Sequence, residues 1–158
     1  NPKELDDFLS RANAILGINF HPTSANKNTA VDLSACKNIK LFNSYGDDIN
    51  YLLSRTDILI TDYSSLFADF LMYDKPIVFA KFDHQSYLKE QGLFLDYDKD
   101  LPGSKVQNWQ EMIEKMKDIL INNKDEYKNK RFEMINKIYP IIDGKARERI
   151  ANFIMSLP

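Results

Sequence analysis

The sequence predicts an α/β, Rossmann-like fold in which an open, mostly parallel sheet carries flanking helices. Over the first hundred residues, short apolar segments alternate with segments whose apolar residues recur every three or four positions. This alternation favours right-handed β-α-β crossovers. From about residue 107 onward the apolar spacing is helical, which predicts a helical C-terminal tail. No linker or repeat divides the chain, so we interpret residues 1–158 as a single domain with tail helices over about 107–158.

The elements before the central strand follow from apolar spacing and from helix-start and helix-stop residues. Helices show a one-sided apolar stripe, strands are short apolar runs, and acidic residues favour helix starts. In order, we expect a helix over residues 3–16 ended by Gly17, a strand over 18–20, a surface loop over 23–37, a strand over 39–42, and a helix from Asp47 and Asp48 to about Arg55.

The clearest strand covers residues 57–61, because its apolar run is typical of a strand buried on both faces. The elements after it follow the same rules. In order, we expect a helix that begins at Ser64 and Ser65 and ends before Lys75-Pro76, a strand over 77–80, a short strand over 93–95, a turn at Pro102-Gly103, and helices over 109–120, 125–138 and 144–156.

Composition argues against several classes of function. The net charge of −2 lacks the basic character of a duplex-binding protein, so nucleic acid is not an expected partner. One cysteine, Cys36, and two histidines, His21 and His84, offer no disulfide and no metal-ligand cluster of recognisable spacing. No apolar run reaches the ~18 residues of a membrane-spanning helix. The chain opens with Asn1 rather than Met, so we treat it as an excised piece of a longer protein.

Three hydroxyls lie where the central strand gives way to a helix. In parallel sheets, ligands bind beyond the carboxyl ends of strands, where helix N-termini offer unpaired N–H groups. The segment from Thr61 and Asp62 to Ser64 and Ser65 occupies such a junction, with both serines expected in the first helical turn. Hydroxyl and N–H donors there suit a phosphate or pyrophosphate. The alternative is that the serines only cap the helix, as serine often does.

Two histidines are candidates for the same rim of the sheet. His21 follows a predicted strand, and its near-neutral pKa in the free state suits a base toward an attacking hydroxyl or a partner for phosphate. His84 lies in a predicted loop over residues 83–87 and is the second candidate. The alternative for each is an ordinary turn residue.

Asp69 is expected on the same helix face as Ser65, one turn further along. Its carboxylate either holds a serine hydroxyl or is solvated. A catalytic carboxylate pair formed by Asp62 and Asp69 is rejected, because no spacing rule places both beside one substrate bond.

The tail is locally basic. Residues 124–149 carry eight basic and five acidic side chains. Such a face either contacts an anionic lipid surface or polymer, or is simply solvated.

Several segments together identify a family resemblance. The stretch TDILITDYSS over residues 56–65 is followed by Asp69 and by KPIVF over 75–79. Further matching positions are Asp83, Tyr87, Gly92, Asp96-Tyr97, Leu101-Pro102-Gly103 and the segment Asp143-Gly144-Lys145-Ala146. In order and spacing, from about His21 to Ile150, the chain resembles the CDP-glycerol glycerophosphotransferases, the teichoic-acid and capsule polymerases.

The resemblance implies a GT-B fold of two Rossmann-like domains, of which this chain resembles the C-terminal half that holds the nucleotide donor. The partner N-terminal GT-B domain lies outside this chain. It further implies site residues. The donor pyrophosphate would be bound by Thr61, Asp62, Ser64 and Ser65, and the catalytic residue would be His21. The cytidine would lie near Asn43, Ser44 and Tyr45. The nucleotide would be contacted, or the site supported, by Asp69, Asp83 and His84.

The implied reaction is attack by a polymer hydroxyl on the glycerol-bearing phosphorus of CDP-glycerol, with CMP as leaving group. Positioning and charge stabilisation suffice for such a transfer, so no cofactor or metal is expected. Gln91 stands where many members carry arginine, which leaves a ribitol-phosphate donor or a nucleotide sugar as alternatives. A further alternative is a non-catalytic nucleotide-binding module.

The expected partners are a nucleotide-activated donor and an anionic polymer acceptor. The expected location is cytoplasmic, with peripheral contact at the inner face of the membrane through the full-length protein. The isolated 158-residue piece is expected to bind donor weakly and to turn over little.

Overall fold

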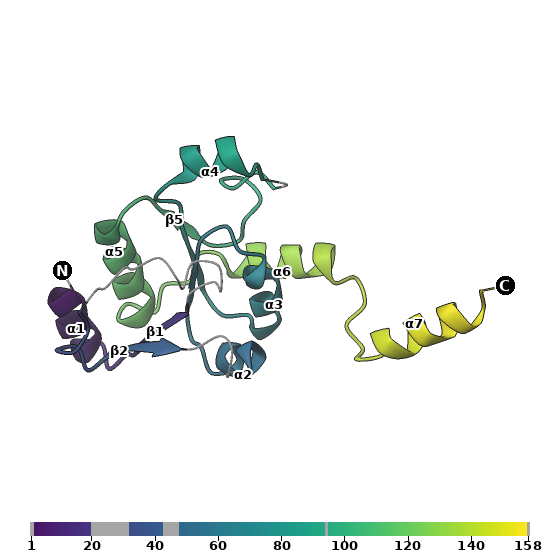
Figure 1. Ribbon diagram of the computed structural model, residues 1–158, viewed down its shortest axis with the longest axis horizontal. Coiled ribbons are helices and arrows are strands. Elements are labelled where there is room, and N and C mark those ends of the chain that lie inside the picture. Colours follow the sequence, from purple (N-terminus) through teal and green to yellow (C-terminus); the bar gives the residue numbers. More distant parts are fainter. Residues whose placement is uncertain (1, 20–31, 43–47, 94, 158) are drawn as a thin grey trace.

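A computed structural model describes residues 2–19, 32–42, 48–93 and 95–157 (Figure 1). The helices and strands are, in order, α1 (Pro2–Arg11), β1 (Leu16–Asn19), β2 (Ile39–Phe42), α2 (Ile49–Ser54), β3 (Leu59–Thr61), α3 (Leu66–Phe70), the 3₁₀ helix η1 (Leu71–Tyr73), β4 (Ile77–Ala80), α4 (His84–Glu90), β5 (Ser104–Val106), α5 (Trp109–Leu120), α6 (Lys128–Ile138) and α7 (Ala146–Met155).

The described strands pair in parallel, as the alternating pattern predicts. β1 pairs with β2, and β3, β4 and β5 form a second sheet in that order. In the second sheet Ile60 lies opposite Val78, which lies opposite Ser104. The strands therefore form two separate hydrogen-bonded sheets rather than one continuous sheet.

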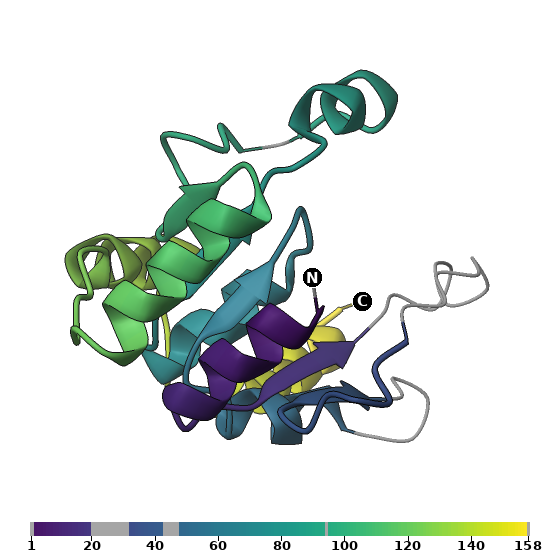
Figure 2. The ribbon, with the colours of Figure 1, turned by 90° about the vertical axis from the view of Figure 1, so that its left-hand side faces the viewer.

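The central strand β4 is buried on both faces, and its alternating side chains feed two apolar cores. Val78 packs with Phe8 of α1 and Met112 of α5, and Figure 2 shows these two helices on the near side of the strands. Ile77 and Phe79 point the other way, into a cluster formed with α2, α3 and α6. Helices thus cover both faces, which gives the predicted α/β layering.

The junction between Pro102 and β5 requires a glycine. A Cβ atom on Gly103 would lie 2.3 Å from the carbonyl oxygen of Ile77, far inside van der Waals contact. The backbone of this turn therefore packs directly against β4, and the turn predicted at Pro102-Gly103 leads straight into a strand.

The first helix is shorter than predicted. α1 ends at Arg11 and not near Leu16, because Asn13 adopts a left-handed conformation with φ of 50°. Gly17 belongs to β1, which begins two residues before the predicted strand. The apolar residues at 12–16 continue the helical spacing by coincidence, since they belong to the turn and the strand.

Two segments between β4 and α5 differ from the prediction. Leu93 and Leu95 lie outside any strand, and the third strand of the sheet is β5 at Ser104–Val106. The expected loop at 83–87 is instead the start of α4. Both errors have one cause, the absence of an apolar pattern. β5 contains Ser104 and Lys105 rather than an apolar run, and α4 (HQSYLKE) has no apolar stripe.

The remaining predicted helices are confirmed with small shifts at their ends. Asp48 caps α2 by accepting a hydrogen bond from the N–H of Asn50 at 2.9 Å. Asn108 caps α5 in the same way through the N–H of Glu111. The two tail helices α6 and α7 lie within the ranges 125–138 and 144–156.

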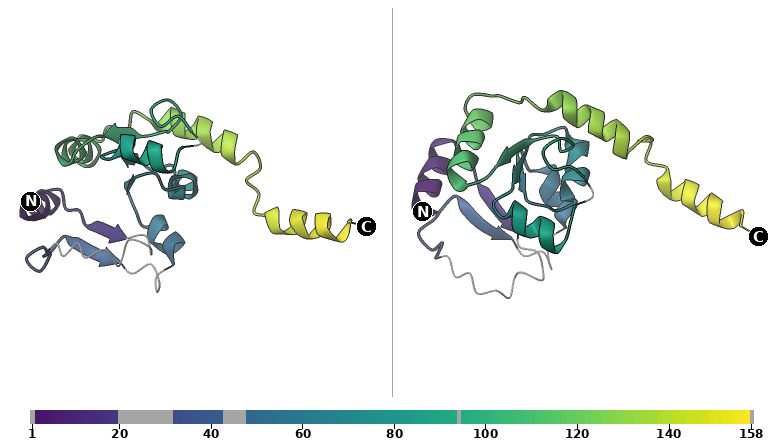
Figure 3. Two further views of the ribbon diagram at one scale, coloured as in Figure 1. Left: turned by 45° about the horizontal axis from the view of Figure 1, so that its top comes forward. Right: turned by 90° about the horizontal axis from the view of Figure 1, so that it is seen from above.

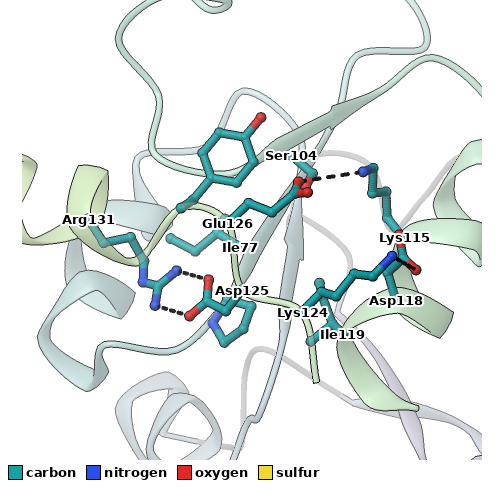
Figure 4. A pocket seen from close by; sticks show the side chains of 11 residues that line it. Ile77, Ser104, Lys115, Asp118, Ile119, Lys124, Asp125, Glu126 and Arg131 are labelled. Atoms are coloured by element: carbon teal, nitrogen blue, oxygen red, sulfur yellow. Dashed lines mark hydrogen bonds and ion pairs between the residues drawn. The ribbon is translucent and has the colours of Figure 1, made fainter. Parts of the chain in front are cut away.

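The tail is fixed to the domain by a buried arginine on α6. Arg131 is 0% exposed, and its guanidinium donates two hydrogen bonds to Asp125, at 2.7 and 2.6 Å (Figure 4). It also donates to the carboxylate of Asp74, at 3.1 Å, just before β4. At least one basic side chain of the tail therefore stabilises the fold and is not part of a free basic surface.

The last helix, α7, extends away from the body of the molecule (Figure 3). It has no buried residue. Arg149 forms an ion pair with Asp143 at 2.7 Å, so a second basic side chain of the tail has an acidic partner within the tail. Among the described helices, none combines the length and the apolar character required to cross a membrane.

Candidate functional site

The turn between β3 and α3 carries the predicted phosphate-binding residues. Thr61 is the last residue of β3, and Ser65 stands at the N-cap position of α3 without a side-chain capping bond. The hydroxyl oxygen of Ser64 accepts a hydrogen bond from the N–H of Leu66 at 3.2 Å. Asp62 in turn accepts from the N–H of Ser64 at 3.3 Å. The two serines lie just before the helix rather than in its first turn.

These contacts distinguish the two serines. Ser64 acts on the start of α3, as the capping interpretation expects. Ser65 is exposed and its side chain makes no capping bond, so capping does not engage its hydroxyl. Since α3 has only five residues, its dipole is small, and hydroxyl donors matter more here than the helix itself.

A buried tyrosine fixes the backbone of this turn. Tyr97 is 4% exposed, and its hydroxyl donates to the carbonyl oxygen of Asp62 at 2.9 Å. Its ring packs edge-on against Phe79 of β4. Tyr97 therefore connects the backbone of the turn to the apolar core.

A second tyrosine joins the turn to α4. The hydroxyl of Tyr63 donates to Asp83 at 2.9 Å, and its ring stacks on Tyr87 with a centroid distance of 3.9 Å. The pKa of Tyr63 is raised above its ordinary value. Burial is the largest cause, and the hydrogen bond to Asp83 is the second. The hydroxyl therefore stays protonated and acts as a donor at neutral pH.

The structure brings His84 to the same place. As the first residue of α4, its ring lies 6.0 Å from that of Tyr63 and 5.2 Å from that of Tyr97. Its Nδ1 atom is buried and has no hydrogen-bond partner within the described chain. His84 also lines a hollow of about 450 Å³ between α4 and Gln107.

Lys81 is a residue of this region that the sequence reasoning missed. It directly follows β4, lines the same hollow and pairs with Asp98 at 2.5 Å. The strand-end rule that singled out Thr61 also applies to the end of β4, and could have found it.

The other predicted residues are placed differently. Asp83 joins the site through Tyr63, but Asp69 accepts a hydrogen bond from the hydroxyl of Tyr139, at 3.4 Å, and not from a serine. Asp69 thus supports the packing of the tail on α3. The remaining predicted site residues, His21, Asn43, Ser44 and Tyr45, lie outside the described residues.

Comparison with known proteins identifies the family. The family model of the CDP-glycerol:poly(glycerophosphate) glycerophosphotransferases matches residues 2–156. The chain belongs to this family. The resemblance based on the motifs around TDILITDYSS is confirmed.

Curated relatives come from teichoic-acid synthesis. The chain is 27% identical over 150 residues to the teichoic acid ribitol-phosphate polymerase TarL of Staphylococcus aureus, covering 94% of this chain and 25% of TarL. It is 36% identical over 109 residues to the teichoic acid glycerol-phosphate transferase of the same organism, covering 68% of this chain and 28% of that protein. The chain thus spans about a quarter of each of these two relatives.

Solved structures support the fold. A structure of the wall teichoic acid polymerase TagF matches with a TM-score of 0.73 and 25% identity, covering 98% of this chain and 38% of that chain. A TagF variant soaked with CDPG matches with a TM-score of 0.72 and 26% identity, covering 96% of this chain and 37% of that chain. The predicted α/β class, with parallel strands and a helical tail, is confirmed.

Proposed function

We propose that this chain is the donor-binding part of a glycerophosphotransferase that moves glycerol phosphate from CDP-glycerol to a growing teichoic acid or capsular polymer, with release of CMP. The observation that carries the proposal is the hydroxyl-lined turn 61–65 at the carboxyl end of β3, in a chain that belongs to this family. Membership alone leaves open which segment takes the donor, and the turn offers donors for a diphosphate.

The proposed reaction requires these residues to position the donor and to stabilise its charge. Transfer of a phosphoryl group depends on holding the donor in line and on stabilising charge, so hydroxyl donors from Thr61, Ser64 and Ser65 are suitable parts. We assign to His21 the role of base toward the acceptor hydroxyl. The proposal includes no cofactor. It places the reaction in the cytoplasm, at the inner face of the membrane.

The identity of the transferred alcohol is the finer part of the proposal. The relatives include a ribitol-phosphate polymerase and a glycerol-phosphate transferase. The TagF variant soaked with CDPG favours the glycerol donor for the family fold. Gln91 is the exposed residue that ends α4, where the resemblance leads us to expect arginine. We therefore propose CDP-glycerol first and CDP-ribitol second.

Titration calorimetry tests donor binding directly. CDP-glycerol, CDP-ribitol and a UDP-sugar are titrated into the protein, and Ser65→Ala is compared with Ser10→Ala, an exposed serine on α1. We expect Ser65→Ala to weaken CDP-glycerol binding about 10-fold, because one charge-assisted hydrogen bond is worth roughly 1.5 kcal/mol. Ser10→Ala should leave it unchanged, and both variants should keep their melting temperature.

Equal binding of CDP-glycerol by the Ser65→Ala variant and the unmodified protein contradicts the placement of the diphosphate at this turn. Preference for the UDP-sugar points to a nucleotide-sugar transferase. Binding without CMP release by the full-length protein, with acceptor polymer present, points to a non-catalytic nucleotide-binding module.

A further inference from the structure

Helix α4 is held to the molecule in an unusual way. It has no buried residue, and Leu88 in its middle is 44% exposed. Figures 1 and 2 both show it at one end of the molecule, beyond the ends of the strands. A helix without an apolar face derives little stability from packing. Its attachment therefore depends largely on contacts with two tyrosines, Tyr63 and Tyr97.

The residue that begins α4 directs its side chain to the turn. Asp83 occupies the N-cap position, yet its carboxylate makes no capping hydrogen bond. That carboxylate instead accepts the hydrogen bond from the hydroxyl of Tyr63 at 2.9 Å. By contrast, Asp48 and Asn108 use their side chains to cap α2 and α5. The side chain of Asp83 thus does not cap its own helix and instead bonds to Tyr63, twenty residues earlier in the chain.

Tyr63 lies within the turn that the proposed function assigns to the diphosphate. Its neighbours are Asp62, whose carbonyl oxygen Tyr97 holds, and Ser64, whose N–H donates to Asp62. The backbone between these anchors is short, so a displacement of Tyr63 moves the hydroxyl of Ser64 as well. The ring of Tyr63 also stacks on Tyr87, which carries the same displacement to α4.

We propose that Tyr63 is a positioning residue whose hydrogen bond to Asp83 couples the turn 61–65 to helix α4. This inference rests on the proposed function, because it concerns the same site. Binding of a nucleotide diphosphate at the turn then orders α4, and an ordered α4 favours binding in return, since coupling between two sites is reciprocal. α4 also forms one wall of the hollow lined by Lys81 and His84, so the coupling sets the shape of that hollow.

Hydrogen exchange of the unliganded protein tests the contact by itself. The amides of Tyr87 and Gln91 donate within and at the end of α4, to the carbonyl oxygens of Asp83 and Tyr87. In Tyr63→Phe we expect these amides to exchange about 3- to 10-fold faster, because one hydrogen bond of about 1 kcal/mol is lost. Tyr87→Phe is the matched control, because it keeps the stacked ring. Unchanged exchange in Tyr63→Phe overturns the inference.

Donor kinetics of the full-length protein test the coupling. Tyr63→Phe and Asp83→Ala should each raise the KM for CDP-glycerol about 3- to 10-fold with a smaller change in kcat, and the double variant should be no worse than either alone. Asp83→Asn keeps an acceptor oxygen and should restore most of the loss. Additive effects of Tyr63→Phe and Asp83→Ala on KM show that the two residues act separately, which overturns the inference.

The two experiments separate the inference from the proposed function. Failure of the unmodified protein to bind any CDP compound contradicts the proposed function. The exchange of α4 amides without ligand reports only on the contact between Tyr63 and Asp83. Faster exchange in Tyr63→Phe supports the contact whichever ligand the turn binds.

Discussion

Helices α6 and α4 are both tied to a turn through an aspartate, and the two ties differ in kind. On α6, the buried guanidinium of Arg131 meets the carboxylates of Asp74 and Asp125. At the start of α4, the exposed residue Asp83 accepts a hydrogen bond from the hydroxyl of Tyr63, which lies in the turn 61–65. A buried charge without its partners is costly, whereas a hydrogen bond to an exposed carboxylate is readily exchanged for one to water. The first contact therefore contributes more to stability than the second, which can form and break at little cost.

The largest expected effect is the loss of the α6 tie. Arg131→Met keeps an apolar stem but leaves Asp74 and Asp125 without their counter-charge. Their side chains are 49% and 30% exposed, so water offsets part of the loss, and we expect about 2–3 kcal/mol less stability in urea unfolding.

Arg149→Met is the matched control for this change. Its side chain is 43% exposed and pairs with Asp143, so we expect at most about 0.5 kcal/mol. Equal costs for the two variants would remove the distinction between buried and exposed ties.

A medium effect is expected where a buried side chain supports the turn. Tyr97→Phe keeps the ring in the core and deletes the hydrogen bond to the carbonyl oxygen of Asp62. We expect a loss of about 1 kcal/mol in the free energy of unfolding, together with weaker CDP-glycerol binding. A change in stability without any change in binding would show that the turn tolerates the loss of its anchor.

The smallest effect concerns the acid range of pH. Hydrogen bonds from Arg131 hold the pKa of Asp125 below its ordinary value of about 3.9. A carboxyl whose pKa is lower in the folded state stabilises the fold above its unfolded pKa, and the contribution is lost as the pH falls through the folded pKa.

Urea unfolding of the unmodified protein and of Asp125→Asn, measured between pH 7 and pH 3, tests this. The stability gap between them should be constant above about pH 5 and should narrow below the unfolded pKa. A gap that stays constant down to pH 3 would mean that Asp125 contributes by shape and not by charge.

Local patterns in the sequence predicted the elements that bury apolar side chains. β3, β4 and α5 follow their spacing closely, and Asp48 marks the start of α2 as expected. β5 and α4 were missed because neither has an apolar pattern. Spacing detects only elements that carry an apolar pattern, so a polar strand or a helix without an apolar stripe leaves little trace in it.

The candidate site shows the same limit. The turn 61–65 was predictable because it is one continuous segment at a strand end. The bonds from Tyr63 to Asp83 and from Tyr97 to Asp62 join residues 20 and 35 positions apart, and no local rule links them. Helical spacing left two alternatives for Asp69, a serine hydroxyl or solvent, whereas its carboxylate accepts a hydrogen bond from Tyr139 of the tail, 70 positions away.

The capping bond of Ser64 has a chemical consequence for the two interpretations of the serines. A hydroxyl has one proton and two lone pairs, and the N–H of Leu66 occupies a lone pair only. The proton of Ser64 remains free to point away from the helix. One serine can thus terminate the helix and still donate to an oxyanion, so a structural duty and a recognition duty are compatible on a single oxygen atom.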